Sequence, residues 1–168
     1  MGNKADNLKR PGSLPFEISH ERLGQLLDLA QIIPWEADAE SWCFTYVGTQ
    51  AVAILGYPVE QWFEKDFWTS HLHPDDRDET IRFCEESSAH LENYTFEYRM
   101  LSANGQAVWL RDLVSVDFVD GKPKTLRGFM IDITQVKQAE EETIREKEKQ
   151  LENLLSNVNV IVLRRVIG

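Results

Sequence analysis

Histidine and aspartate residues gather in one short segment and are the first candidates for chemistry. His71 and His73 stand two residues apart, and Asp75 and Asp76 follow them. These residue types ligate divalent metals, but the i, i+2 spacing of the histidines does not place both on one face of a helix. Pro74 and the two acids suit the first turn of a helix, where the helix dipole favours negative charge. The segment therefore predicts a helix start and no metal site.

Two cysteines, Cys43 and Cys84, are the other candidates for reactive chemistry. They fall on different predicted elements without the Cys-x-x-Cys spacing of a zinc or redox site, so we interpret both as small buried hydrophobic residues. The sequence contains no glycine-rich phosphate loop, no nucleophile-elbow motif and no phosphotransfer motif around a histidine. We expect this part of the protein to be non-enzymatic.

Aromatic residues supply either a core or a ligand site. Because aromatic side chains bury large areas, we interpret them mainly as core, with a dedicated aromatic ligand site as the alternative. Asp112 and Asp117 on a predicted strand are candidate polar groups of a pocket, although aspartate is usually exposed. The aromatic residues in question are Trp35, Trp42, Phe44, Tyr46, Trp62, Trp68 and Trp109.

Composition limits the possible functions. The chain has 168 residues, of which 42% are hydrophobic, enough for about one domain with extensions. A formal net charge of −10 argues against binding to nucleic acid, which needs clustered Lys and Arg. No stretch approaches the roughly 18 apolar residues of a membrane span, and no secretory signal opens the chain. We expect a cytoplasmic location.

The segment from Glu92 to Thr134 contains three predicted strands, which would position any site in the second half of the chain. Residues 92–102 alternate between apolar and polar types, which is typical of a half-buried strand. Asn104-Gly105 then gives a strong hairpin signal, because both residues tolerate positive φ. Strands over 107–117 and 124–133 complete a predicted three-stranded antiparallel meander.

The first half of the chain predicts helices and two further strands. Ser19 is a candidate N-cap for a helix with leucines at helical spacing. Pro34 has no N–H to donate, so its strand should lie at a sheet edge or carry a bulge there. The predicted segments are, in chain order, a flexible leader over 1–18, a helix over 19–30, paired strands over 32–38 and 42–47, and helices between 49 and 91, the longest starting at Pro74.

This order of elements indicates an α+β fold: a five-stranded antiparallel sheet with short helices on one face, an N-terminal helix and a C-terminal connector helix. Short motifs are distributed along it at Trp35-Glu36, Leu55-Gly56-Tyr57, His73-Pro74-Asp75-Asp76-Arg77, Glu97-Tyr98-Arg99, Asn104-Gly105, Trp109-Leu110, Gly128-Phe129 and Asp132-Ile133-Thr134. In this order and spacing they closely resemble PAS domains of the PAS fold-3 type with a C-terminal PAC segment. The resemblance covers about residues 30 to 134.

The resemblance implies a sensor or interaction module of a bacterial multidomain signalling protein, with its domain at residues 31–134. The sheet and helices of such a module enclose a small pocket. The signal leaves through Asp132, Ile133 and Thr134 into the following helix. Candidates for lining the pocket are Trp35, Phe44, Trp68, Phe83, Tyr98, Trp109, Asp112 and Met130.

The resemblance also bears on cofactors. Haem-binding PAS domains place a histidine within the long helix, and here only His90 comes near, at its far end. Flavin-binding members that bond a cysteine carry it in an Asn-Cys-Arg-type motif just before this helix, where the present chain reads Thr69-Ser70-His71-Leu72. We therefore expect neither haem nor a cysteinyl-flavin adduct. A non-covalent flavin and an unknown small-molecule ligand stay open.

Residues 135–156 predict a charged connector helix without glycine or proline. A spacing of seven joins Ile144, Leu151 and Val158, which favours a parallel dimeric coiled coil over a single solvated helix. Residues 157–168 are β-prone and resemble the entry into another PAS domain. We expect a homodimer within a longer chain, whose output domain lies beyond this sequence.

Two classes of function follow. The first is a sensory input module that regulates a C-terminal histidine kinase or, close behind, a diguanylate cyclase, through a ligand-dependent shift of the connector helix. The second is a ligand-free dimerisation and spacer module, with the sheet or the 19–30 helix as its interface. A haem or flavin redox sensor is a minor third alternative.

Overall fold

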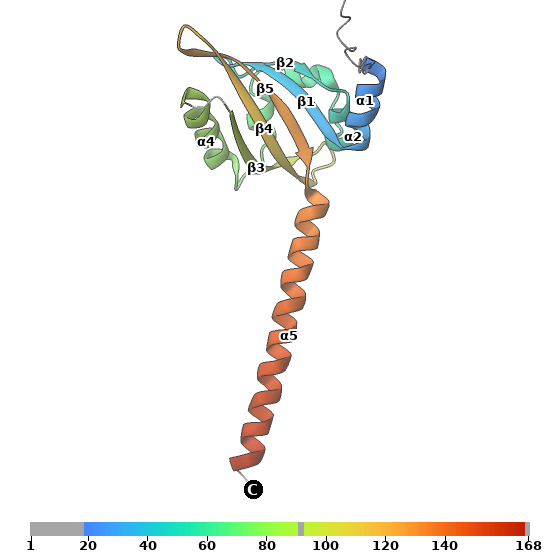
Figure 1. Ribbon diagram of the computed structural model, residues 1–168, viewed down its shortest axis with the longest axis vertical. Coiled ribbons are helices and arrows are strands. Elements are labelled where there is room, and N and C mark those ends of the chain that lie inside the picture. The colour runs from blue at the N-terminus through green and yellow to red at the C-terminus, as the bar shows by residue number, and fades with distance from the viewer. Residues whose placement is uncertain (1–18, 91–92, 167–168) are drawn as a thin grey trace, which may run out of the picture.

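The structure of the protein is a computed structural model that describes residues 19–90 and 93–166 (Figure 1). The predicted leader over residues 1–18 lies outside the described residues. The elements are, in chain order, α1 (His20–Leu29), β1 (Ile32–Asp38), β2 (Phe44–Val47), α2 (Gln50–Leu55), the 3-10 helix η1 (Val59–Phe63), α3 (Phe67–His71), α4 (Arg77–His90), β3 (Asn93–Leu101), β4 (Ala107–Val119), β5 (Lys122–Asp132) and α5 (Thr134–Val166).

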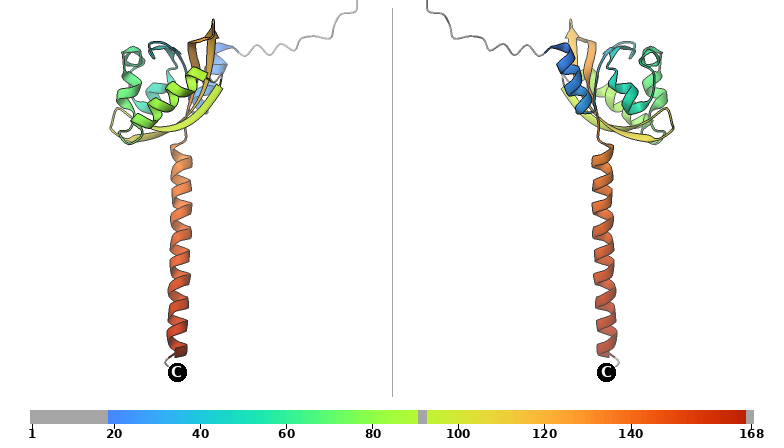
Figure 2. Two further views of the ribbon diagram at one scale, coloured as in Figure 1. Left: turned by 90° about the vertical axis from the view of Figure 1, so that its left-hand side faces the viewer. Right: turned by 90° about the vertical axis from the view of Figure 1, so that its right-hand side faces the viewer.

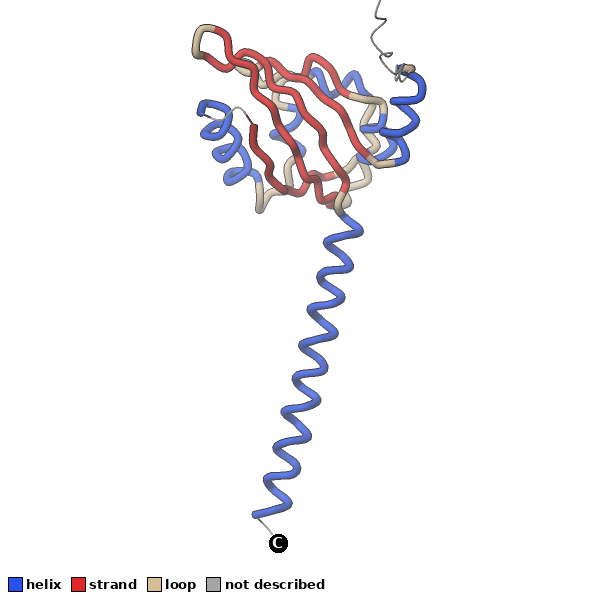
Figure 3. The backbone as a smooth tube through the Cα atoms, in the orientation of Figure 1, coloured by secondary structure: helices blue, strands red, loops and turns tan. Residues whose placement is uncertain are grey.

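Five strands form one antiparallel sheet in the order β2-β1-β5-β4-β3. The last three strands are neighbours both in sequence and in space, as expected for a meander, and β1 with β2 forms the predicted hairpin. β5 joins the two halves because it pairs with both β1 and β4. Helices α2 to α4 cover one face of this sheet (Figures 2 and 3), so the predicted α+β fold is confirmed.

The turn between β3 and β4 follows the prediction from Asn104-Gly105. Gly105 has a φ of 82°, and its N–H donates to the carbonyl of Ser102 at 2.8 Å. Burial alternates along β4, so one side of the strand faces the helices and the other faces solvent. This alternation determines which side chains of β4 can line an interior site.

The prediction that Pro34 lies in an edge strand or at a bulge is wrong. Its strand, β1, is internal to the sheet, and the bulge of β1 falls between Glu36 and Ala37. The carbonyl of Pro34 accepts from the N–H of Gly48 at 2.8 Å, just beyond the last β1–β2 pair. In an antiparallel strand the N–H and C=O of one residue point to the same side, so the missing N–H of Pro34 also faces Gly48. The proline is tolerated because the ladder ends there.

The helices begin close to the predicted positions. The Ser19 side chain accepts from the N–H of Arg22 at 3.2 Å, which confirms it as the N-cap of α1. The helix predicted from Pro74 was placed too early, since α4 begins at Arg77. The preceding residues form a turn in which the carbonyl of His73 accepts from the N–H groups of Asp76 and Arg77.

α5 runs unbroken for 33 residues and projects away from the sheet (Figures 1 and 3). The helix was predicted to end near Ser156, so the β tendency assigned to residues 157–168 is wrong for the described part of that segment. A strand without a partner leaves its backbone groups unpaired, whereas a helix that already exists gains one hydrogen bond for each added residue. Within the described part of the chain, no helix is long and apolar enough to cross a membrane.

Candidate functional site: an interior cavity and the junction to α5

The main interior site is a small cavity between the helix-covered face of the sheet and the helices α3 and α4. Its open volume is about 30 Å³, room for one or two water molecules. Strands β1, β2, β3, β4 and β5 all contribute to its wall. The lining residues are Trp35, Ala37, Trp42, Phe44, Trp68, Cys84, Tyr94, Phe96, Asp112, Val114, Leu126 and Met130.

Asp112 is the one charged side chain among the described residues that line this cavity, and it is only 2% exposed. Its Oδ1 accepts from Nε1 of Trp35 at 2.9 Å, and its Oδ2 accepts from the hydroxyl of Tyr98 at 3.3 Å. The strand register sets Asp112 opposite Phe96 on β3 and Met130 on β5. Among the described side chains, those that donate to the Asp112 carboxylate are neutral, and the wall around it is mainly apolar.

Burial raises the pKa of Asp112 to about 7, although the hydrogen bonds from Trp35 and Tyr98 oppose this shift. Burial also raises the pKa of Tyr98 well above its ordinary value, and the nearby carboxyl group of Asp112 adds to that shift. The charged form of Asp112 is thus costly in this environment, because no cation compensates for the water it has lost.

A second tryptophan extends the hydrogen-bond chain to the mouth of the cavity. Nε1 of Trp68 donates to the hydroxyl of Tyr98 at 3.1 Å, so Trp68 and Asp112 are linked through one tyrosine. Trp42 stacks on Trp68 with ring centroids 6.5 Å apart and an interplanar angle of 11°. Both tryptophans are half-buried, and together they form the outer wall of the cavity.

The structure brings together most of the pocket residues predicted from the sequence. Five of the eight line the cavity, and Tyr98 lies directly behind its wall. Phe83 and Trp109 do not reach it: with Phe96 they line a separate surface groove of about 280 Å³ between α4 and the edge of the sheet. The five lining residues are Trp35, Phe44, Trp68, Asp112 and Met130.

Seven lining residues were not among the predicted pocket residues: Ala37, Trp42, Cys84, Tyr94, Phe96, Val114 and Leu126. Tyr94 and Phe96 could have been found from the alternation along β3, since they share a face with Tyr98. Trp42 and Cys84 carry no such signal, because each approaches the cavity from outside the regular strands. Burial raises the pKa of the Cys84 thiol above its ordinary range, so the thiol is neutral.

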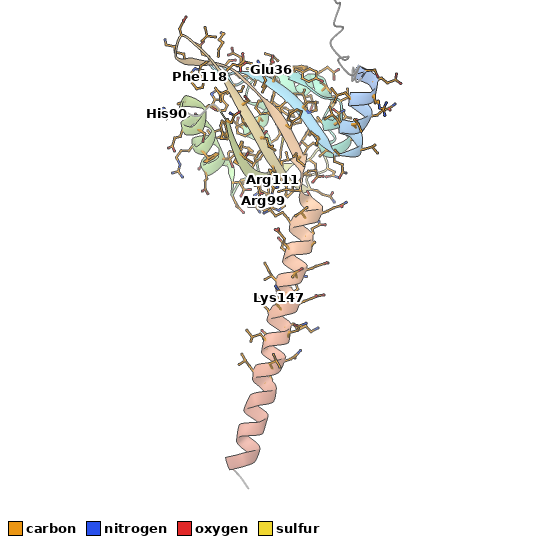
Figure 4. The ribbon with its side chains drawn as sticks, viewed as in Figure 1. Glu36, His90, Arg99, Arg111, Phe118 and Lys147 are labelled. Carbon is orange, nitrogen blue, oxygen red and sulfur yellow. The ribbon has the colours of Figure 1, made fainter. Side chains whose placement is uncertain are left out.

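The residues around the cavity do not fit a haem or a flavin. The cavity volume is far below that of either group, and no histidine is among its described lining residues. His90 is exposed at the end of α4 (Figure 4). Across the described ranges, no group of three or more His, Cys, Asp or Glu residues could hold a metal ion.

The residues predicted for signal transmission form a hydrogen-bonded junction between β5 and α5. Oδ1 of Asp132 accepts from the N–H of Thr134 at 2.9 Å, and Oγ1 of Thr134 accepts from the N–H of Trp109 at 3.0 Å. The N–H of Ile133, a buried residue, donates to the carbonyl of Trp109 at 2.9 Å. The start of α5 is therefore fixed to β4 by two hydrogen bonds to one residue.

Charged side chains strengthen the same junction. Glu97 on β3 contacts Nζ of Lys137 on α5 at 2.7 Å and the guanidinium of Arg111 on β4 at 2.6 Å. The hydrogen bond from Lys137, and next that from Arg111, holds the pKa of Glu97 below its usual range. Cations of Arg99 and Lys137 both lie over the Trp109 ring, at 5.4 and 5.1 Å from its centroid. Arg99 and Arg111 lie at the end of the sheet beside α5 (Figure 4).

The family described as PAS fold (PAS_3) matches residues 44–130, more than half of the chain. The chain belongs to the PAS family. This PAS domain is 25% identical over 125 residues to the sensor protein FixL of Bradyrhizobium diazoefficiens, a match that covers 74% of the chain and 24% of FixL. The chain thus spans about a quarter of the length of that relative.

Solved structures of other PAS proteins have the same fold. The N-terminal domain of a diguanylate cyclase with PAS/PAC sensor from Marinobacter aquaeolei is 35% identical with a TM-score of 0.59, over 62% of this chain and 96% of that one. A sensory box histidine kinase/response regulator from Burkholderia thailandensis is 22% identical with a TM-score of 0.62, over 79% of this chain and 98% of that one. The second likeness concerns the fold alone.

Proposed function

We propose that this PAS domain is the sensory input module of a cytoplasmic multidomain signalling protein. In this proposal the cavity around Asp112 binds a small molecule, and the junction at Asp132, Ile133 and Thr134 passes the change to α5. The domain comprises residues 31–134, and the connector begins at residue 135. Its role is to regulate an output domain, not to catalyse a reaction.

The observation that carries the proposal is that cavity and junction share two adjacent strands. On β4, Asp112 lines the cavity, and Trp109, three residues before it, holds the start of α5. On β5, Met130 lines the cavity, and Asp132 follows two residues later in the junction. A change in side-chain packing at the cavity can therefore shift both strands where they contact α5.

The exposed apolar residues of α5 support a parallel homodimer. Ile144 and Leu151 are both 57% exposed and stand seven residues apart, as the a positions of a coiled coil do. Leu154 is exposed as well and occupies the matching d position. Lys147, labelled on α5 in Figure 4, interrupts this stripe at another d position. Pairing of two copies would cover the leucines of the C-terminal half.

The class of the output domain is proposed from similar proteins. Similar domains occur in proteins named as a diguanylate cyclase and a histidine kinase. We favour a histidine kinase, with a diguanylate cyclase close behind, and we propose that another PAS domain begins near residue 157. All of these rest on the family resemblance, since the chain spans only part of its relatives.

A ligand-free dimerisation and spacer module is the second candidate. The observation that favours it is the cavity volume of about 30 Å³, which the surrounding side chains leave nearly filled. In this case α5, the outer sheet face or α1 would act only as an interface. Leu23, Leu26 and Leu29 of α1 are exposed, as an interface helix requires.

The substitution Asp132→Ala in the full-length protein separates the two candidates. It removes the acceptor for the N–H of Thr134, so the sensory proposal predicts loss of regulated output with the dimer intact by analytical ultracentrifugation. Asp78→Ala, which truncates an exposed aspartate of α4, is the control. Regulation that persists unchanged in Asp132→Ala contradicts transmission through the junction and favours the spacer.

A further inference from the structure

The hydrogen bonds at Asp112 come from the nearby donors Trp35 and Tyr98 and leave its carboxylate able to accept more. Trp35 donates to Oδ1 of Asp112, Tyr98 donates to Oδ2, and Trp68 donates to Tyr98. The hydroxyls of Tyr94 and Ser88 bond to each other at 2.7 Å. A carboxylate has about four lone-pair sites, so Asp112 can still accept. A ligand group that faces it must therefore be a donor.

The described cavity wall can carry negative charge and no positive charge. Asp112, whose pKa is raised by burial to about 7, is the one side chain of the described wall that ionises near neutral pH. The titratable groups that face it from β3 and α4, namely Tyr94, Tyr98 and Cys84, all have pKa values raised by burial and are neutral. A buried carboxylate without a counter-ion is costly, and a bound cation would remove that cost.

Aromatic rings provide the rest of the wall. Six of the twelve lining residues are aromatic, and three of these are tryptophans. The negative faces of such rings attract cations, most strongly for tryptophan, and rings that surround an ammonium group form a common recognition site for it. One carboxylate among several aromatic rings thus has the chemistry of an organic-cation site.

We propose that the cavity beside Asp112 binds a small organic cation, such as a protonated amine, with the Asp112 carboxylate as its counter-ion. This inference rests on the proposed sensory function and names the class of ligand for the same site. An anion would meet the carboxylate without any cationic partner, and a neutral ligand would leave the charge uncompensated.

Trp42 is the side chain that admits the ligand. The present volume of about 30 Å³ is too small for an amine of several carbon atoms, so part of the wall must move. Trp42 has a φ of 58°, a left-handed conformation that strains a bulky residue, and its side chain is half-buried over Trp68. Displacement of its ring enlarges the cavity without disturbing a strand, because Trp42 lies between β1 and β2.

The test uses three probes with the same branched four-carbon skeleton and different charge: isobutylamine, isobutanol and isobutyrate. Binding to the whole 168-residue chain is measured by isothermal titration calorimetry at about pH 8, where Asp112 is ionised and the amine is protonated. We expect isobutylamine to bind at least tenfold more tightly than isobutanol, and isobutyrate not to bind. Lowering the pH to about 5 should weaken amine binding at least tenfold, because Asp112 becomes protonated.

Variants make the result specific to Asp112. Asp112→Asn should abolish the preference for the amine, whereas Asp117→Asn, an exposed aspartate on the same strand, should keep it. Trp42→Ala opens the mouth without touching the carboxylate and should bind the amine at least as tightly as the wild type.

Any of four results overturns the inference: equal affinity for amine and alcohol, binding of isobutyrate, an amine preference that survives in Asp112→Asn, or no binding of the amine even to Trp42→Ala. The sensory proposal is tested independently by Asp132→Ala. If regulation is lost in Asp132→Ala and the amine titration also fails, the sensory function is supported and only the proposed ligand class is rejected.

Discussion

Replacing Asp112 by asparagine should stabilise the fold, and the gain should grow with pH. The pKa of Asp112 is raised from an ordinary 3.8 to about 7 in the folded protein. Between these two values the folded protein holds a proton that the unfolded chain has released, so stability falls as the pH rises through this range. Below 3.8 both states are protonated and the cost is absent; above about 7 it levels off.

The magnitude follows from the two pKa values. One pKa unit corresponds to about 1.4 kcal/mol, so the shift costs the fold about 2 kcal/mol at pH 5 and about 4 kcal/mol at pH 8. Asparagine carries no charge and avoids this cost, while its side-chain oxygen can still accept from Trp35. We therefore expect the stability of Asp112→Asn minus that of the wild type to increase by about 2 to 3 kcal/mol between pH 5 and pH 8.

The assay is urea unfolding of both proteins at several pH values, followed by tryptophan fluorescence. Other titrating groups are common to the two proteins, so the difference between their curves isolates Asp112. Asp117→Asn, which removes an exposed carboxylate from the same strand, serves as the control for the change of residue type. A difference that stays flat from pH 5 to pH 8 would refute the buried, uncompensated carboxylate on which the site is built.

Three further predictions concern packing, the junction and the dimer. Gly48→Ala should destabilise the fold by about 1 to 3 kcal/mol in thermal unfolding, because the new Cβ would lie 2.6 Å from Cδ of Pro34. Gly24→Ala is the control and should not destabilise the fold, because its Cβ would have nothing within 4 Å. Thr134→Val should cost about 1 kcal/mol and speed hydrogen exchange at the start of α5, since it removes the acceptor for the N–H of Trp109; unchanged exchange would contradict the junction. Leu151→Asp should convert the dimer to monomer in sedimentation, whereas a dimer that persists would remove α5 as the interface.

Local patterns accounted for most of the fold. The alternation of apolar and polar residues and the Asn104-Gly105 turn predicted the meander, and the Ser19 cap predicted the start of α1, because these signals act over a few residues. Pro34 was misplaced because edge position depends on strand order, which only the complete sheet determines. The end of α5 was missed because β propensity gives no strand where there is no partner to pair with.

The site was less predictable than the fold. Alternation along β4 put Asp112 on the inner face, but its burial depends on the helices that cover it. Phe83 and Trp109 were wrongly grouped with the cavity because aromatic type alone does not tell an interior wall from a surface groove. Trp42 was named only for the alternative aromatic ligand site and not among the pocket residues, since it lies in a turn between strands, where side-chain direction follows no period.

Asp112 has two effects at one position: its burial lowers the stability of the fold, and its carboxylate gives the cavity wall a negative charge. If stability alone mattered, asparagine would be favoured over a buried acid without a counter-ion at this position. It lines the cavity three residues from the junction at Trp109, as a ligand-responsive carboxylate would.

Hydrogen–deuterium exchange at the start of α5 tests most directly whether the cavity and the connector are coupled. Exchange in residues 134–144 should differ between the wild type and Asp112→Asn, although this substitution lies in the cavity and touches no residue of α5. Asp117→Asn should leave exchange in that segment as it is in the wild type. Identical exchange in all three proteins would contradict transmission from the cavity to α5.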